Sequence, residues 1–293
     1  MTNPNTIQNQ PNVLGQVLVQ RQAVAARLAK IKHVVAVMSG KGGVGKSALT
    51  ANLAAALAMQ GRQVGVLDAD IHGASAAAML GARRQQVAID PEGARPAMGV
   101  ANVRVMSMDL FLDDDDTPVV WRHPGGLAAD TFVWRGTLET NALREFLADT
   151  AWGALDYLLI DMPPGADRFE TLLRLVPNLS GTLVVTIPSQ VSHLVVRRAI
   201  TAARQAGACL LGLVENMAGW VEGEIIRELF PAGQGQAFAA QVNIPYLGQI
   251  PFDPGLARTT DAGRPFVLEH GETLAGQAIL ALVQQIEIAL ESP

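Results

Sequence analysis

The chain has 293 residues, a formal net charge of −5 at pH 7 and a hydrophobic content of 49%. This size and composition allow one large α/β domain with a sizeable core. The acidic balance and the aromatic content of 5% argue against a surface that binds nucleic acid. The one cysteine, Cys209, excludes an intramolecular disulfide framework and suits the cytoplasm. We expect Cys209 to be a small, buried core residue at the start of a strand.

The N-terminal part of the chain divides into two predicted segments. Residues 1–11 contain Asn, Gln, Thr and Pro without apolar periodicity, which predicts a disordered tail. Residues 12–32 are predicted to form a helix whose apolar side includes Val17, Val24 and Leu28. Its basic character leaves open a membrane-surface or partner-binding helix. We favour a helix that packs on the domain, because its apolar side has few bulky residues.

From His33 onward, apolar segments of strand length alternate with helical segments. The predicted strands are 33–38, 63–68, 103–107, 156–160, 182–187, 209–214 and 246–250. The predicted helices include 47–59, 138–149, 192–206, 235–241 and 274–290. Such alternation is typical of a doubly wound, mainly parallel sheet with right-handed crossovers. Residues 33–293 are therefore predicted to form a single α/β domain.

A glycine-rich segment, SGKGGVGKS from Ser39 to Ser47, joins the first predicted strand to its helix. It fits the phosphate-binding loop pattern G-x-x-x-x-G-K-[ST], in which glycines let backbone N–H groups point at phosphate oxygens. Lys46 would reach the β- and γ-phosphates, and the Ser47 hydroxyl would bind Mg²⁺. The residues expected to contact the nucleotide here are Gly40, Gly42, Gly43, Val44, Gly45, Lys46, Ser47 and Ala48.

Carboxylates follow two other predicted strands. The second strand ends with Asp68 and Asp70, and the fourth is followed by Asp161 and Gly165. Ligands of parallel sheets bind beyond the carboxyl ends of the strands, so these residues are expected at the phosphate site. Asp161 would hold the Mg²⁺ water shell, Asp70 would orient the attacking water beside the metal, and Gly165 would offer its N–H to the γ-phosphate. Asp68 is given a supporting role. The alternative for each aspartate is a turn residue or helix cap.

Lys41, directly after the first glycine, makes the loop resemble the deviant Walker A loop of the MinD, ParA and nitrogenase-iron-protein class of SIMIBI-type NTPases. Five segments resemble the Mrp/ApbC type of iron–sulfur cluster carrier ATPase in particular. They are DADIHGAS at 68–75, WRG at 134–136, WGALDYLLIDMPPG at 152–165, ENM at 215–217 and LGQIPFD at 247–253. The resemblance implies an ATPase that binds ATP, ADP and Mg²⁺ as a homodimer. Lys41 would then reach the partner's nucleotide and stabilise charge there, as an arginine finger does. A solvated loop lysine is the alternative.

The same resemblance implies further nucleotide contacts from the C-terminal half of the chain. Asn216 would recognise the adenine edge, to which an amide offers both a donor and an acceptor. Pro251 and Asp253, in the LGQIPFD segment, would lie at the nucleotide. A turn residue at a strand end is the alternative for Asn216.

The chain departs from the family pattern at two places. Cluster carriers of this family have a C-x-x-C pair shortly after the Asn-Met dipeptide, and two subunits supply four thiolates to one [4Fe–4S] cluster. The corresponding segment here, residues 218–225, contains no cysteine, so a cluster bound in the family manner is not supported. The family's glycine-threonine-glycine-aspartate after the Pro-Pro pair is also changed, to GADR from Gly165 to Arg168. This change leaves open a different response of the loop to the γ-phosphate.

Residues 113–135 are predicted to contain an insertion relative to the family. The segment has a run of four aspartates, which we expect to be a solvated loop because like charges repel. The family's single Trp-Arg pair occurs twice, at 121–122 and 134–135, and a Pro-Gly-Gly turn between the two indicates an exposed loop that contacts a partner. His72, expected near the nucleotide, is assigned to a loop and not to a metal site, since no second His or Cys lies at ligand spacing.

The last predicted helix, 274–290, is strongly apolar and has no Lys or Arg. We expect it to pack in the core and not on an anionic membrane surface. No apolar run approaches the roughly 20 residues of a membrane-spanning helix.

The leading hypothesis from the sequence is a cytoplasmic, Mg²⁺-dependent, homodimeric ATPase of Mrp/ApbC type that assists an iron–sulfur or other metalloenzyme client. One alternative is a MinD/ParA-like ATPase that recruits or positions a protein partner. A DNA-partitioning ATPase is a third hypothesis, which the acidic net charge disfavours.

Overall fold

The computed structural model describes residues 13–112, 131–165, 167–176, 178–223, 225–231 and 234–291. The predicted tail at 1–11 and residues 113–130 of the predicted insertion lie outside this described part of the chain.

The centre of the molecule is a nine-stranded sheet with the order β10-β9-β8-β1-β7-β2-β6-β5, in which β11 also pairs with β9. Its strands are β1 Ile31–Ser39, β2 Val64–Asp68, β5 Ala97–Met98, β6 Arg104–Met106, β7 Leu155–Asp161, β8 Gly181–Thr186, β9 Leu210–Glu222, β10 Ile225–Arg227 and β11 Tyr246–Phe252. Within this sheet, among the described residues, the pairings β5–β6 and β10–β9 are antiparallel and the others are parallel. The seven predicted strands and the mainly parallel sheet are confirmed.

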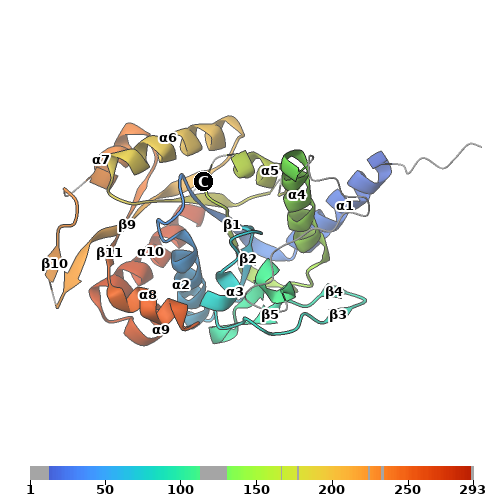
Figure 1. Ribbon diagram of the computed structural model, residues 1–293, viewed down its shortest axis with the longest axis horizontal. Helices are drawn as coiled ribbons and strands as arrows, with labels where there is room; N and C mark the ends of the chain where they lie inside the picture. The colour runs from blue at the N-terminus through green and yellow to red at the C-terminus, as the bar shows by residue number, and fades with distance from the viewer. Residues whose placement is uncertain are drawn as a thin grey trace, which may run out of the picture.

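Helices cover both faces of this sheet (Figure 1). On one face lie α2 Lys46–Met59, α3 Ala76–Met79, α8 Pro254–Asp261, α9 Val267–His270 and α10 Leu274–Glu291. On the other lie α1 Val13–Leu28, α4 Thr131–Asp149, α5 Asp167–Leu175, α6 Gln190–Gln205 and α7 Gln234–Gln241. Each face has its own large cluster of buried apolar side chains. Coverage on both faces explains why β2 and β8 are buried along their whole length and read as continuous apolar runs.

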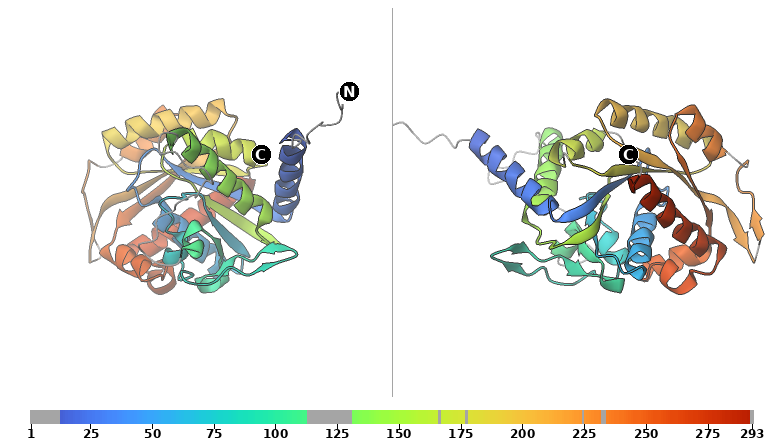
Figure 2. Two further views of the ribbon diagram at one scale, coloured as in Figure 1. Left: turned by 45° about the vertical axis from the view of Figure 1, so that its right-hand side comes forward. Right: turned by 180° about the vertical axis from the view of Figure 1, so that it is seen from behind.

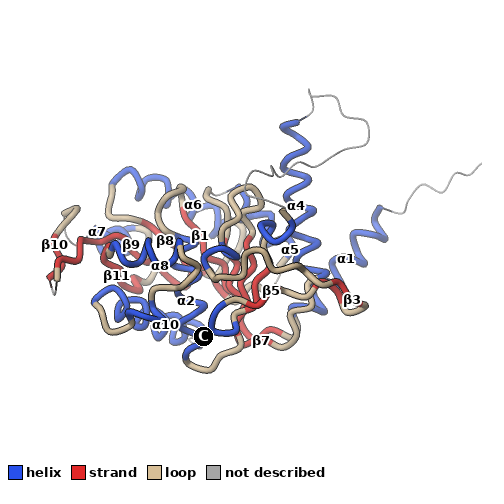
Figure 3. Tube along the Cα trace, turned by 60° about the horizontal axis from the view of Figure 1, so that its bottom comes forward, coloured by secondary structure: helices blue, strands red, loops and turns tan. Residues whose placement is uncertain are grey.

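The remaining short elements lie at the ends of the molecule. The β3–β4 ribbon, Ile89–Asp90 with Gly93–Ala94, and the β9–β10 hairpin lie at opposite ends (Figure 3). Two short 3-10 helices, η1 Val100–Asn102 and η2 Met108–Phe111, flank β6. The sequence did not predict the hairpin, because β9 continues eight residues beyond the predicted strand end at 214, through Asn216 to Glu222.

Two helices at the termini pack on the domain as the patterning predicts, but α1 ends at Leu28, and residues 31–32 of the predicted helix belong to β1. Helix α1 lies beside α4, where the Arg27 Nε donates to the Ala148 carbonyl oxygen at 3.0 Å (Figure 2). Helix α10 is long and apolar enough to cross a membrane by composition alone, yet it packs on α2 and β11 with Ile279 and Val283 buried. The expectation that residues 274–290 pack in the core is therefore confirmed.

Two expectations are wrong. Cys209 is exposed, because it lies before the start of β9 and outside the core. The exposed loop expected between the two Trp-Arg pairs does not continue to the second pair, because residues 131–135 belong to α4.

Candidate functional site

The loop from Gly40 to Gly45 leaves the sheet at its centre. Strand β1, which leads into it, lies between β7 and β8, and β2 follows on the other side of β7. In the register of these strands, Asp161 pairs with Val37 on one side and with Asp68 on the other. The ends of three parallel strands therefore meet the glycine loop at one edge of the sheet, where ligands of such sheets bind.

The backbone of the loop requires its glycines. Gly43 and Gly45 have φ angles of 76° and 79°, in the left-handed region, and Gly45 directly precedes α2. A Cβ on Gly45 would lie 2.3 Å from the Asn216 Nδ2, and one on Gly40 would lie 2.7 Å from the Val196 backbone nitrogen. The loop is thus held closely between β9 and α6, with the N-terminus of the 14-residue helix α2 behind it. This is the geometry of an anion-binding loop.

Lys46 and Asp161 form a buried ion pair at the base of the loop. The Lys46 Nζ donates to the Asp161 Oδ1 at 2.5 Å, and the pair is almost inaccessible to solvent. Thr50, one turn further along α2, also donates to this oxygen, at 3.1 Å, while the Ser47 Oγ accepts from the Lys46 Nζ at 3.3 Å. The second oxygen, Asp161 Oδ2, is buried and has no hydrogen-bond partner within the described part of the chain.

A hydrated Mg²⁺ ion fits this arrangement. The orphaned Asp161 Oδ2 can accept from a metal-bound water, and the Ser47 hydroxyl, 3.3 Å from the Lys46 Nζ that pairs with Asp161, can supply a hard oxygen ligand. Such partial coordination through one or two protein oxygens plus phosphate is what Mg²⁺ prefers. The residues therefore fit a nucleotide with its magnesium ion.

Asp68 is the second buried carboxylate of the site. Its Oδ2 accepts from the backbone N–H groups of Ser75 and Ala76, at 2.8 and 2.9 Å, and from the Ser107 hydroxyl at 3.1 Å. These bonds fix the loop that follows β2, including the start of α3. Burial, followed by the nearby charge of Asp161, raises the pKa of Asp68 to about 7. Asp68 thus acts on the loop rather than by contact with a phosphate.

Asp68 makes stability depend on pH, and an Asp68→Asn variant should remove that dependence. In the folded protein the Asp68 carboxyl keeps its proton up to about pH 7, whereas in the unfolded chain it releases the proton near pH 3.8. The contribution of protonated Asp68 to the free energy of unfolding is therefore complete below pH 3.8 and is lost as the pH rises toward 7. Between pH 4 and 7.5, the free energy of unfolding of wild type should fall by about 3 kcal/mol more than that of Asp68→Asn. Urea unfolding in EDTA measures this. Parallel pH profiles of the two proteins would contradict it.

The other residues predicted to act in ATP hydrolysis lie around the Lys46–Asp161 pair. Asp70 is half-buried two residues beyond Asp68, and its Oδ1 accepts from the Gly73 N–H at 3.1 Å. The Gly165 N–H donates to the Ser39 carbonyl oxygen at 3.1 Å, so this bond must open before the N–H can meet a γ-phosphate. The Lys41 side chain is half-buried, and no residue in the described ranges forms an ion pair with it.

Asn216 is attached directly to the loop. Its Nδ2 donates to the Val44 carbonyl oxygen at 2.8 Å, so one amide hydrogen is used to hold the loop. Pro251 lies beside Asn216, because Ile250 pairs with Asn216 in the β9–β11 register. The Asp253 Oδ1 accepts from the Gly255 N–H at 2.7 Å and caps α8. The hydrogen bond that the structure shows for the Asp253 side chain is therefore a helix cap.

A carboxylate that the sequence did not single out joins two of the loops at the site. The Glu139 Oε1 lies 2.9 Å from the His72 Nε2, and its Oε2 pairs with the Arg168 guanidinium. His72 follows β2, Arg168 lies in the first turn of α5 after β7, and Glu139 comes from α4. Arg168 stands where the family has an aspartate, and a cation in a first turn opposes the helix dipole. Its pairing with Glu139 offsets this, and no local sequence pattern predicts such a contact. His72 is thus a loop residue, as expected.

An iron–sulfur cluster does not fit the described residues. Cys209 lies just before the start of β9, whereas Asn216, which is bonded to the glycine loop, lies in the middle of that strand. The hairpin that follows Asn216 supplies Trp220, Val221 and Glu222 in place of thiols. No group of three or more His, Cys, Asp or Glu residues within the described ranges is arranged to hold a metal ion.

The fold and the site define a P-loop nucleotide-binding protein. A family model described as "ParA: NUBPL iron-transfer P-loop NTPase" matches residues 30–129 and 127–287. The chain belongs to this family.

Relatives of the chain agree with this assignment. An iron-sulfur cluster carrier protein of Saccharolobus solfataricus is 40% identical over 306 aligned positions, covering 99% of each chain. The cytosolic Fe-S cluster assembly factor NUBP2 of Bos taurus is 38% identical over 90% of this chain and 95% of its own length. These matches confirm the Mrp/ApbC-type hypothesis over the MinD/ParA alternative.

Solved structures show the same fold. The nucleotide-binding protein of Archaeoglobus fulgidus, in complex with ADP, has a TM-score of 0.71 and 36% identity, and the match covers 85% of this chain and 93% of that one. The cell-division ATPase MinD of Pyrococcus furiosus has a TM-score of 0.61 at 24% identity over 88% of this chain and 99% of its own, a likeness of fold alone.

Proposed function

We propose that this protein is a Mg²⁺-dependent ATPase that works as a homodimeric switch in the cytoplasm. It would assist the maturation of iron–sulfur or other metallocofactor proteins, as the names of its relatives, an iron-sulfur cluster carrier protein and a cytosolic Fe-S cluster assembly factor, suggest. The observation that carries the ATPase part is the buried Lys46–Asp161 pair beneath the glycine loop. The Asp161 Oδ2 has no hydrogen-bond partner among the described residues, so it can accept from a water bound to Mg²⁺.

Each predicted residue has a defined task in this proposal. The backbone from Gly40 to Ala48 would surround the phosphates, Ser47 and Asp161 would hold Mg²⁺, and Asp70 would orient the attacking water beside the metal. Asn216, Pro251 and Asp253 would contact the base and its surroundings. Lys41 would act on the nucleotide of the partner subunit.

The switch would depend on one hydrogen bond. The Gly165 N–H is bonded to the Ser39 carbonyl oxygen, which keeps the loop after β7 folded back on β1. ATP has a γ-phosphate that can take this N–H, whereas ADP does not. ATP and ADP would therefore favour different arrangements of this loop, and the change would pass to Arg168 and Glu139.

Phosphate release tests the ATPase part directly. Purified protein with Mg²⁺ and ATP should release phosphate, and the release should stop when EDTA removes the metal. Binding of ATP without any release, even at high protein concentration, would contradict hydrolysis while leaving nucleotide binding intact.

Iron binding should separate this protein from carriers that hold a cluster. Anaerobic incubation with ferrous iron and sulfide should leave the protein nearly colourless, with far less than one [4Fe–4S] cluster per dimer, because two exposed Cys209 thiols cannot supply four ligands. Iron analysis and visible absorbance after desalting measure this. Stoichiometric iron that survives a Cys209→Ser substitution would show that other ligands hold a cluster.

A further inference from the structure

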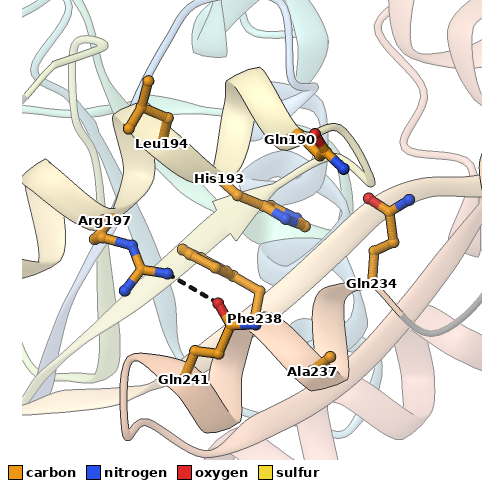
Figure 4. A pocket seen from close by; sticks show the side chains of 8 residues that line it. All are labelled: Gln190, His193, Leu194, Arg197, Gln234, Ala237, Phe238 and Gln241. Carbon is orange, nitrogen blue, oxygen red and sulfur yellow. Dashed lines mark hydrogen bonds between the residues drawn. The ribbon is translucent and has the colours of Figure 1, made fainter.

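A groove lies between α6 and α7, with a volume of about 480 Å³ (Figure 4). His193 of α6 and Phe238 of α7 stack across it, with ring centroids 4.3 Å apart and planes within 5° of parallel. The Arg197 guanidinium lies 5.4 Å from the same phenyl ring, and its Nη2 donates to the Gln241 Oε1 at 2.9 Å. The groove is therefore built by specific contacts and is not a gap between loosely packed helices.

His193 leaves one polar atom of this groove without a partner. The residue is 9% exposed, and its Nε2 is buried with no hydrogen-bond partner in the described part of the chain. Burial, and then the charge of Arg197, lower the pKa of His193, so the imidazole is neutral near pH 7. In its Nε2–H tautomer it can donate to a carboxylate or a peptide carbonyl placed in the groove. An unsatisfied buried polar atom costs stability unless a ligand satisfies it.

The surface around the groove is apolar and basic. Val191 and Leu194 are 67% and 54% exposed, and with Arg198 they recur at helical spacing on one face of α6. Helix α6 has arginines at 197, 198 and 204 and no acidic residue, and α7 has no charged residue at all. The Arg204 guanidinium is used within the protein, since its Nη2 donates to two backbone carbonyls at 2.6 Å. This basic face belongs to a chain whose net charge is −5.

Charge decides among the possible occupants. The same face of a second copy would be equally basic, so two copies would repel each other there. Exposed Val191 and Leu194 beside the arginines suit a protein segment with apolar side chains better than a nucleic-acid backbone. An amphipathic segment with carboxylates beside apolar residues complements the surface.

Both walls of the groove are attached to the phosphate-binding loop. On the α6 side, the backbone at Val196 lies so close to Gly40 that no Cβ fits between them. On the α7 side, Gly235 packs against the buried carboxylate of Glu215, with the position of its Cβ only 2.5 Å from the Glu215 Cδ. Glu215 adjoins Asn216, which is bonded to Val44 in the loop. A shift of either helix would therefore move a contact of the loop.

We propose that the α6–α7 groove is a docking site for an acidic, amphipathic segment of a partner protein, and that docking is coupled to the nucleotide site. The docking half stands independently of the proposed function, whereas the coupling half rests on nucleotide binding. Coupling is reciprocal: a nucleotide that changes the affinity for the segment is itself bound more or less tightly when the segment is present.

Fluorescence anisotropy with two synthetic probes tests the docking half. One probe is a helical peptide of about 14 residues with leucines on one face and flanking glutamates, and the other has lysines in place of the glutamates. Without nucleotide, the acidic probe should bind the full chain, and the basic probe should not. Arg197→Glu should weaken binding by about tenfold or more. Arg258→Glu, the same charge change on exposed α8, is the matched control and should stay within about twofold of wild type.

The outcomes separate docking from its alternatives. No binding of the acidic probe, equal weakening by Arg197→Glu and Arg258→Glu, or tighter binding of labelled duplex DNA than of the acidic probe would overturn the docking site. Leu194→Ala gives a second check, because it removes apolar contact without changing charge and should also weaken the acidic probe.

Addition of Mg²⁺ and ADP or ATP tests the coupling half. At least one nucleotide should change the affinity for the acidic probe by about threefold or more, and the probe should change the affinity for that nucleotide by the same factor. Nucleotide that binds without altering the probe affinity would overturn the coupling. Absence of nucleotide binding would overturn the proposed function but leave the docking result standing.

Discussion

A Lys46→Ala variant is expected to bind ATP at least about 100-fold more weakly than wild type, because it removes the charge that would meet the β- and γ-phosphates. The same change leaves the buried Asp161 carboxylate without its cation, which should also lower the free energy of unfolding by about 3 kcal/mol or more. Calorimetric titration with Mg²⁺ and ATP measures the first effect, and urea unfolding measures the second.

Two further variants separate these effects. Lys32→Ala removes an exposed lysine from the opposite end of β1 and should bind ATP as wild type does. Ser47→Ala keeps the Lys46–Asp161 pair and should mainly weaken the dependence of ATP binding on Mg²⁺. A folded Lys46→Ala protein with ATP affinity within about threefold of wild type would show that the nucleotide binds elsewhere.

A Lys41→Ala variant should separate hydrolysis from binding. Because Lys41 would act on charge that develops in the partner's nucleotide, its loss should lower the rate of phosphate release by about 100-fold or more, with ATP affinity changed only a few-fold. Lys41 also lacks an ion-pair partner among the described residues, so its removal should leave stability almost unchanged. Phosphate release at saturating ATP and thermal unfolding measure the two quantities. An unchanged turnover rate would contradict this role and support the alternative, in which Lys41 is a solvated loop lysine.

The sequence predicts the centre of the site well, because the chemistry there is local. The spacing of Lys46 and Ser47 within the loop, and the position of Asp161 at a strand end, are both fixed by short patterns. The parallel sheet then brings these residues to one edge, and the register places Asp161 between Val37 and Asp68. For the same reason the strands were predictable, since helices on both faces require continuous apolar runs.

Contacts between distant segments were not predictable from a single sequence. Glu139 meets His72 and Arg168 only because α4 lies across the loops after β2 and β7. Thr50 was within reach of inference, since it follows Lys46 at the i+4 spacing of a helix face and donates to the same carboxylate. Cys209 was wrongly predicted to be buried. Its hydrophobic character does not indicate that it lies just before β9 and outside the buried part of that strand.

The central claim, a nucleotide site shared by two subunits, is tested most directly by mixing two inactive variants. Lys41→Ala and Asp70→Ala proteins should each release phosphate slowly. In a mixture that exchanges subunits freely, half of the dimers contain one site with both an intact Asp70 and the partner's intact Lys41, so activity should recover to about a quarter of wild type. A mixture no more active than its separate components, with exchange confirmed by differently labelled subunits, would contradict the shared site.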